Sequence, residues 1–147
     1  MKHFLLVRHG LIDYNTQALN EDGRDFALTL TKLVKLYPIE CIITDEEERC
    51  VDTIKPLSTS LKIDPILLSK MDFSNAVDVL NRAPSATTSI ICYRIESVNP
   101  LLEVLKLPIF TPETRDSAYE FIWSIHLGGN GGVAEHKQIP TGFRKPQ

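Results

Sequence analysis

The chain has few cysteines, no long apolar run and no excess of positive charge. Its three cysteines show no CxxC spacing, which argues against a disulfide framework and against a zinc site. No segment approaches the roughly 20 apolar residues that are needed to cross a bilayer. The formal net charge of −3 provides no broad basic surface for a nucleic acid. We therefore expect neither membrane nor nucleic-acid partners.

The first residues also lack the features of a secretory signal and of a nucleotide-binding loop. The apolar run Phe4–Val7 is short and is followed by arginine and histidine, unlike a signal peptide. No glycine-rich phosphate loop follows it, and we expect a cytoplasmic protein. With 147 residues, 43% apolar and 24% charged, the chain fits one domain. We place this domain at residues 1–127 and expect a flexible Gly/Pro-rich tail over residues 128–147.

Apolar segments recur along the chain in the manner of strands and helices that follow one another. Strands are predicted over residues 4–7, 39–43, 87–93 and 119–123, and helices over residues 30–37, 45–56, 73–82 and 100–105. Strands that alternate with helices favour parallel pairing, because a crossover helix returns the chain to the same edge of the sheet. The sequence therefore predicts an α/β fold with a mainly parallel sheet covered on both faces.

Capping patterns locate the first two helices. Thr29 or Thr31 is the expected cap of the first helix, which leaves the polar segment before it as a loop. Thr44 and Glu47 have the spacing of a capping box for the second helix. Because proline lacks a backbone N–H, Pro56 is expected to kink or restart this second helix.

Arg8 and His9 end the first predicted strand, next to Gly10. In an open α/β sheet, ligands bind at the carboxyl ends of the strands. The planar fork of an arginine suits phosphate oxygens, and a neutral imidazole can act as a nucleophile or a base. This segment therefore predicts phosphate chemistry.

The run Leu6-Val7-Arg8-His9-Gly10, followed by Asn15, resembles the signature of the histidine phosphatase superfamily, whose fold is phosphoglycerate mutase-like. A second segment resembles the family at matching offsets, with Thr44, Arg49 and Thr53. The absence of large insertions makes the chain similar to the compact phosphohistidine phosphatases. The resemblance implies a three-layer α/β sandwich in its minimal form.

The resemblance, which spans residues 1–123, also implies roles for individual side chains. His9 would be the nucleophile, and Arg8 and Arg49 would bind the phosphoryl oxygens together with Asn15. This chemistry requires no metal and no cofactor.

Two positions depart from the family pattern. Lys70 stands where the family commonly has the glutamate that protonates the leaving group, and a lysine that stays charged near neutral pH is a poor acid in that role. Asp72 is two residues away and could substitute if the loop rearranged. Tyr93 stands where a second histidine binds the phosphoryl group, and a phenol cannot supply the charge of an imidazolium. These departures predict a degenerate active site.

Other residues could restore the missing positive charge. Arg94 would do so if it turned into the site, although adjacent residues on a strand face opposite sides of the sheet. His126 and His136 are further candidates from the C-terminal region. If Lys70 and Arg94 both face the ligand, the site would suit a polyanionic ligand.

Two functions stay open. The first is a phosphatase of weak activity that hydrolyses a phosphomonoester or a phosphohistidine through a phosphohistidine intermediate. The second is a catalytically impaired pseudo-phosphatase that binds a phosphorylated small molecule or a phosphoprotein. Catalysis needs the whole set of groups, whereas anion binding needs only the arginines and the turn. The sequence therefore leaves enzymatic activity undecided, and it leaves a homodimer open.

Overall fold

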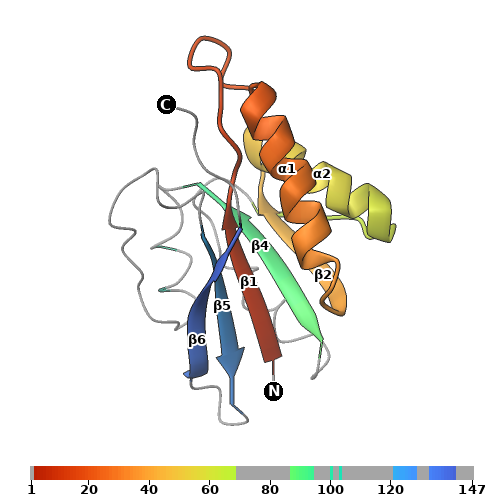
Figure 1. Cartoon of the computed structure of the whole chain (residues 1–147), viewed down its shortest axis with the longest axis vertical. Coiled ribbons are helices and arrows are strands. Elements are labelled where there is room, and N and C mark those ends of the chain that lie inside the picture. The colour runs from red at the N-terminus through yellow and green to blue at the C-terminus, as the bar shows by residue number, and fades with distance from the viewer. Residues whose placement is uncertain are drawn as a thin grey trace.

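The computed structural model describes residues 2–68, 87–94, 100, 103, 121–128 and 133–141. In these residues a mixed sheet is accompanied by two helices (Figure 1). The strands are β1 (Lys2–Arg8), β2 (Ile39–Asp45), β3 (Ile66–Leu68), β4 (Thr88–Tyr93), β5 (Phe121–Leu127) and β6 (Val133–Pro140), and the helices are α1 (Glu21–Val34) and α2 (Glu48–Leu61).

The strands lie in the order β3-β2-β4-β1-β5-β6. The pairs β1 with β4, β2 with β4 and β2 with β3 are parallel, whereas β5 is antiparallel to both β1 and β6. The parallel part confirms the predicted α/β class, and strand β5, which runs antiparallel to both of its neighbours, makes the sheet mixed. Because β1, β2 and β4 run in the same direction, their carboxyl ends meet at one edge of the sheet.

One core lies between the sheet and the two helices, which pack on the same face of the sheet (Figure 1). It contains apolar residues of β1, β4, α1 and α2, namely Leu5, Val7, Ile90, Cys92, Phe26, Leu30, Ile54 and Leu57. The alternate residues Phe4, Leu6 and Ile91 are also buried, so β1 and β4 are covered on both faces. A strand buried on both faces requires a continuous apolar run, and this explains the run at the start of the chain.

Helix α1 begins earlier than the sequence predicts. Asn20, rather than Thr29 or Thr31, is the N-cap, and its side chain accepts the backbone N–H of Gly23 at 2.8 Å. Gly23 resembles a helix breaker in sequence, yet it lies in the first turn and packs against the loop after β1. A Cβ on Gly23 would lie 2.0 Å from the carbonyl oxygen of Leu11. The glycine therefore allows the helix to approach this loop.

Helix α2 also differs from the prediction at both ends. Thr44 belongs to β2 and does not cap the helix, and Glu47 is an N-cap whose side chain makes no capping hydrogen bond. Instead, Asp45 Oδ1 accepts the N–H of Glu47 at 3.0 Å. The helix continues through Pro56 to Leu61, since an interior proline removes one helical hydrogen bond and leaves the others in place.

The prediction of a flexible tail after Gly128 is wrong for residues 133–140, which form β6 and pair with β5. Strand β5 extends the strand predicted over residues 119–123 to Leu127 and is followed by β6, so it is not the last strand. The predicted helix over residues 73–82 lies outside the described residues. Of the helix predicted over residues 100–105, only Pro100 and Glu103 are described, and both are helical.

Candidate active site

His9 directly follows β1 at the carboxyl edge of the sheet and is 4% exposed. Its backbone N–H donates to the carbonyl oxygen of Tyr93 at 3.2 Å, which continues the pairing of β1 with β4 beyond the strand. Its ring Nδ1 lies 2.7 Å from the carbonyl oxygen of Gly10. Because a carbonyl oxygen can only accept, Nδ1 carries the hydrogen, and in the neutral imidazole the lone pair lies on Nε2.

The turn that carries His9 is fastened to α2. The N–H of Gly10 donates to Thr53 Oγ1 at 2.8 Å, and this hydroxyl donates to the carbonyl oxygen of Arg49 at 2.7 Å. A Cβ on Gly10 would lie 2.7 Å from the carbonyl oxygen of Gly23, so the turn also packs tightly against the start of α1. Thr53 therefore links the turn of the predicted nucleophile to the helical turn of a predicted phosphate-binding arginine.

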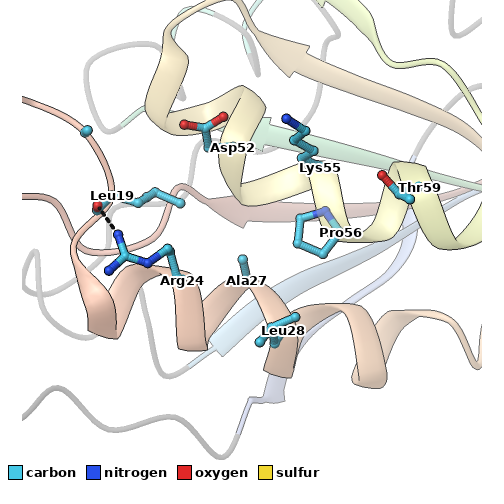
Figure 2. A pocket seen from close by; sticks show the side chains of 9 residues that line it. Leu19, Arg24, Ala27, Leu28, Asp52, Lys55, Pro56 and Thr59 are labelled. Atoms are coloured by element: carbon cyan, nitrogen blue, oxygen red, sulfur yellow. Dashed lines mark hydrogen bonds between the residues drawn. The ribbon is translucent and has the colours of Figure 1, made fainter.

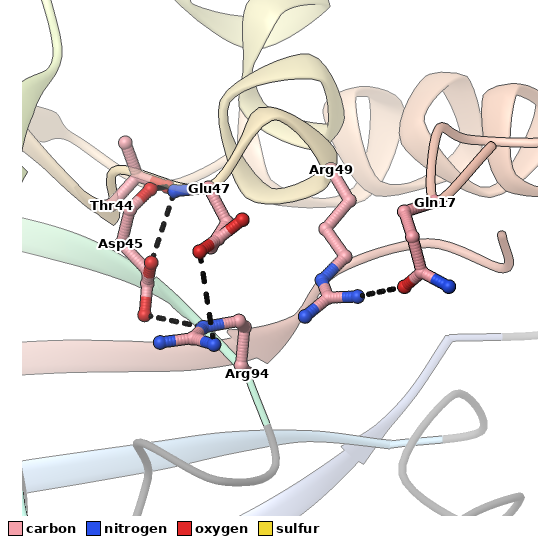
Figure 3. Close-up of polar contacts among 6 residues, drawn as sticks. All are labelled: Gln17, Thr44, Asp45, Glu47, Arg49 and Arg94. Atoms are coloured by element: carbon pink, nitrogen blue, oxygen red, sulfur yellow. Dashed lines mark hydrogen bonds and ion pairs between the residues drawn. The ribbon is translucent and has the colours of Figure 1, made fainter. Parts of the chain in front are cut away.

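Arg49 lies in the first turn of α2, where the helix dipole favours an anion. Its Nη1 donates to Oε1 of Gln17, 2.9 Å away, which comes from the loop between β1 and α1 (Figure 3). Its Nε is buried and has no hydrogen-bond partner among the described residues. The hydrogen-bonding capacity of this Nε is therefore not used by the described residues.

Arg8 and Tyr93 are register partners on β1 and β4, so their side chains leave the sheet on the same face. Arg8 is 6% exposed and Tyr93 is 1% exposed. The residue predicted to stand in for a second histidine is thus a buried phenol next to Arg8.

Arg94 lies just after β4, at the same edge of the sheet as Arg49 (Figure 3). Its Nε donates to Asp45 Oδ2 at 2.9 Å, and its Nη1 lies 3.9 Å from Glu47 Oε1. Asp45 is 2% exposed, so its charge is weakly screened by solvent. Two carboxylates therefore offset the positive charge that Arg94 brings to this edge. The other acids of the run, Glu46 and Glu48, are exposed.

Asn15 lies in an exposed loop that projects beyond the edge of the sheet (Figure 1). Its backbone N–H donates to Asp13 Oδ1 at 2.8 Å, and an isolated bridge between Ile12 and Leu19 closes the loop. Among the described residues, no hydrogen bond joins the Asn15 side chain to Arg8 or Arg49. A phosphate contact of Asn15 stays a prediction.

The suggestion that His126 could serve the site is wrong. His126 is opposite His3 at the other end of β1, and the two rings stack with centroids 4.0 Å apart and an interplanar angle of 6°. The separation of His3 from His9 corresponds to roughly 20 Å along an extended strand. His136 is paired with Ile125, whose partner on β1 is Phe4, so its backbone also lies away from the His9 edge.

Lys70 and Asp72 lie outside the described residues, so the predictions for both stay predictions. Sequence reasoning did not single out Gln17. Nothing in the local sequence marks this residue, because its partner Arg49 is 32 positions away.

Cys41 and Cys50 are unsuited to act as nucleophiles. A hydrogen bond with Cys92, together with burial, raises the pKa of the Cys50 thiol far above its ordinary value. Burial likewise raises the pKa of Cys41. A thiol must lose its proton to attack phosphorus, so these two groups stay unreactive near neutral pH. His9 therefore stays the predicted nucleophile at this edge.

A groove of about 590 Å³ lies between α1 and α2 (Figure 2). It is lined by Ala18, Leu19, Arg24, Ala27, Leu28, Asp52, Lys55, Pro56 and Thr59. None of the predicted phosphate-binding residues is among them, so this groove is separate from the candidate active site. In the described part of the chain no helix has the length and apolar character needed to span a membrane.

The chain matches the family model of the histidine phosphatase superfamily (branch 1) over residues 4–72. The matched segment includes Arg8, His9, Asn15, Arg49 and Thr53. A search of curated protein sequences gave no significant match.

Solved structures share the fold over nearly the whole chain. The protein histidine phosphatase SixA complexed with tungstate has a TM-score of 0.65 at 19% identity, covering 95% of this chain and 97% of that chain. Phosphoserine phosphatase of Entamoeba histolytica in complex with 3-phosphoglyceric acid has a TM-score of 0.63 at 12% identity, covering 100% and 98%. The mycobacterial glucosyl-3-phosphoglycerate phosphatase complexed with VO3 has a TM-score of 0.65 at 12% identity, covering 94% and 97%. The first half of the chain is therefore similar in sequence to the histidine phosphatase superfamily (branch 1), and the whole chain shares the fold of these phosphatases.

Proposed function

We propose that this protein is a weakly active phosphatase that hydrolyses a phosphomonoester or a phosphohistidine through a phosphohistidine intermediate on His9. One observation carries the proposal, the 2.7 Å hydrogen bond between His9 Nδ1 and the carbonyl oxygen of Gly10. This bond fixes the tautomer in which Nε2 has the lone pair, as a nucleophile requires. The turn that holds the ring is in turn fastened to α2 by Thr53.

In the proposed reaction His9 Nε2 attacks phosphorus in line with the leaving group. The new N–P bond forms as the bond to the leaving oxygen or nitrogen breaks, and Arg8 and Arg49 stabilise the charge on the equatorial oxygens. Water then attacks the phosphohistidine, which releases inorganic phosphate and restores the imidazole. Asn15 would contact the phosphoryl group if the loop after β1 closed over it.

The expected weakness follows from the residues at the acid and second-histidine positions. Lys70 is a poor proton donor for an alkoxide leaving group near neutral pH. Substrates whose leaving group needs no proton from the enzyme, such as an aryl phosphate or a phosphohistidine whose other ring nitrogen is already protonated, should therefore react better than an alkyl phosphate.

A second function, a pseudo-phosphatase that binds a phosphorylated small molecule or a phosphoprotein, is favoured by a different observation. Arg94 is paired with Asp45 and faces Glu47, and Tyr93 is buried in place of a histidine. These residues offer less positive charge to a transition state than an imidazolium would. Ground-state binding of an anion by Arg8 and Arg49 does not require that charge.

The experiment that separates the two functions is labelling with phosphoramidate as the phosphate donor. The proposal expects acid-labile, alkali-stable phosphate on the wild-type protein, release of inorganic phosphate on each turnover, and no label on His9→Ala. A label that forms without turnover would show that only the first step has survived. Vanadate binding without any label would favour the pseudo-phosphatase and contradict the phosphatase.

A further inference from the structure

Gln17 uses its whole amide group to connect the loop after β1 with α2. Its Nε2 donates to the carbonyl oxygen of Tyr14 at 3.0 Å, and its Oε1 accepts from Arg49 Nη1 at 2.9 Å. Its backbone N–H donates to the carbonyl oxygen of Asp13 at 2.7 Å. The residue has a φ of 65°, a left-handed conformation that a glutamine seldom adopts. The loop thus holds the Gln17 side chain in one place, although this residue is exposed.

The contact with Gln17 decides which edge of the Arg49 guanidinium a ligand can meet. A guanidinium has an end-on fork made by Nη1 and Nη2, and a side-on fork made by Nε and Nη2. Because Nη1 is bound to Gln17, the end-on fork is partly occupied. Nε is buried without a hydrogen-bond partner among the described residues, and a buried N–H without a partner is costly. Figure 3 shows that this edge points away from Gln17, toward the side on which Arg94 lies.

We propose that Gln17 is a positioning residue, which holds Nη1 of Arg49 so that the Nε/Nη2 fork faces two oxygens of a phosphoryl group. The inference rests on the proposed function, because it assigns Arg49 to the phosphate. An amide oxygen orients the guanidinium without cancelling its charge, in contrast to the carboxylate of Asp45 at Arg94. Gln17 therefore orients the guanidinium of Arg49 and leaves its positive charge for the ligand, as bidentate recognition of a phosphate requires.

The test compares orthovanadate binding by calorimetry with the hydrolysis of p-nitrophenyl phosphate. Gln17→Met keeps the length of the side chain but removes the acceptor, and it should weaken vanadate binding about tenfold, as expected for a hydrogen bond to a charged group. Tyr14→Ala is the matched control, because its exposed side chain lies in the same loop and its backbone carbonyl is retained. Both variants should melt at the wild-type temperature.

Two further variants separate positioning from a general loss of structure. In an Arg49→Lys background there is no fork to orient, so Gln17→Met should have little additional effect on vanadate binding. Gln17→Glu retains the acceptor but adds a negative charge. Its loss of affinity should shrink as the salt concentration rises, whereas the loss in Gln17→Met should persist.

The outcomes distinguish this inference from the proposed function. Equal losses from Gln17→Met in the wild-type and Arg49→Lys backgrounds, or no loss in either, would overturn the role of Gln17 and leave the phosphatase intact. The expected coupling in a protein that binds vanadate but hydrolyses nothing would support Gln17 and overturn the phosphatase. A wild-type protein that binds no vanadate would overturn both.

Discussion

The two ends of β1 each hold a buried histidine, and the two are bonded in different ways. At the amino end, both ring nitrogens of His3 meet hydroxyls, with Thr88 Oγ1 at 3.0 Å and Ser124 Oγ at 2.6 Å. The ring is also stacked on His126. At the carboxyl end, His9 Nδ1 bonds to the carbonyl oxygen of the next residue. His3 thus ties three strands together, whereas the bond of His9 selects a tautomer.

Burial alone does not distinguish the predicted nucleophile His9 from the structural histidine His3. His3 is 8% exposed and His9 is 4% exposed, so the exposed fraction of the residue does not separate the two. What separates them is their surroundings, because only His9 lies at the edge where parallel strands, a helix N-terminus and Arg49 meet. The following predictions test the hypothesis that the His3 end of β1 is a structural end and that the His9 end is a reactive end.

Replacement of His9 should have the largest effect on the reaction. His9→Ala removes the nucleophile, so hydrolysis of p-nitrophenyl phosphate should fall by about a thousandfold or more. Steady-state rates with freshly purified protein would measure this, with far-UV circular dichroism as the control for folding. Substantial turnover in His9→Ala would mean that water attacks phosphorus directly and that the reactive end has been misassigned.

Replacement of His3 should act on stability and not on the reaction. His3→Ala leaves the buried hydroxyls of Thr88 and Ser124 without their imidazole partner, and the free energy of unfolding should fall by about 2–4 kcal/mol. Urea denaturation would measure the loss. His126→Phe should lower the free energy of unfolding by less than His3→Ala does. It keeps a ring against His3, and it removes an Nδ1 that is buried without a partner among the described residues. If folded His3→Ala bound vanadate with a changed affinity, His3 would not be purely structural, and the division into two ends would be wrong.

The sequence predicted strand β1 and the helix that carries Arg49 because their signals are local. A strand that ends in Arg8-His9-Gly10 can be recognised from adjacent residues, and the offset between Arg49 and Thr53 is one turn of a helix. The cap at Asn20 was missed because Gly23 looks like a breaker until the contact with Leu11 is known.

The remaining misses depend on contacts between distant residues. Arg94 and Asp45 are 49 positions apart, and Gln17 and Arg49 are 32 positions apart. No local sequence pattern therefore predicts either contact. Strand β6 was missed for a related reason. It is polar at Glu135, Lys137 and Gln138, and a polar edge strand is defined by its pairing more than by its own residues.

The smallest expected effect concerns the carboxylate that offsets Arg94. Asp45→Asn removes a buried negative charge at the reactive end while keeping one oxygen acceptor for Arg94 or for the Glu47 N–H. Vanadate should then bind about fivefold more tightly at low salt, since the charge of Arg94 is no longer cancelled. The melting temperature should fall, because a buried ion pair is broken. Calorimetry well below the melting temperature would measure the affinity.

Glu48→Gln is the matched control for Asp45→Asn. It removes an exposed carboxylate from the first turn of α2, and solvent screening should keep its effect on vanadate affinity below about twofold. Tighter binding in Asp45→Asn alone would show that the Asp45–Arg94 pair limits the positive charge at the reactive end. Weaker binding in Asp45→Asn would show the reverse: Arg94 would then contact the anion directly and need the carboxylate of Asp45 to hold it there. In that case the ion pair between Asp45 and Arg94 would both stabilise the fold and bind the anion.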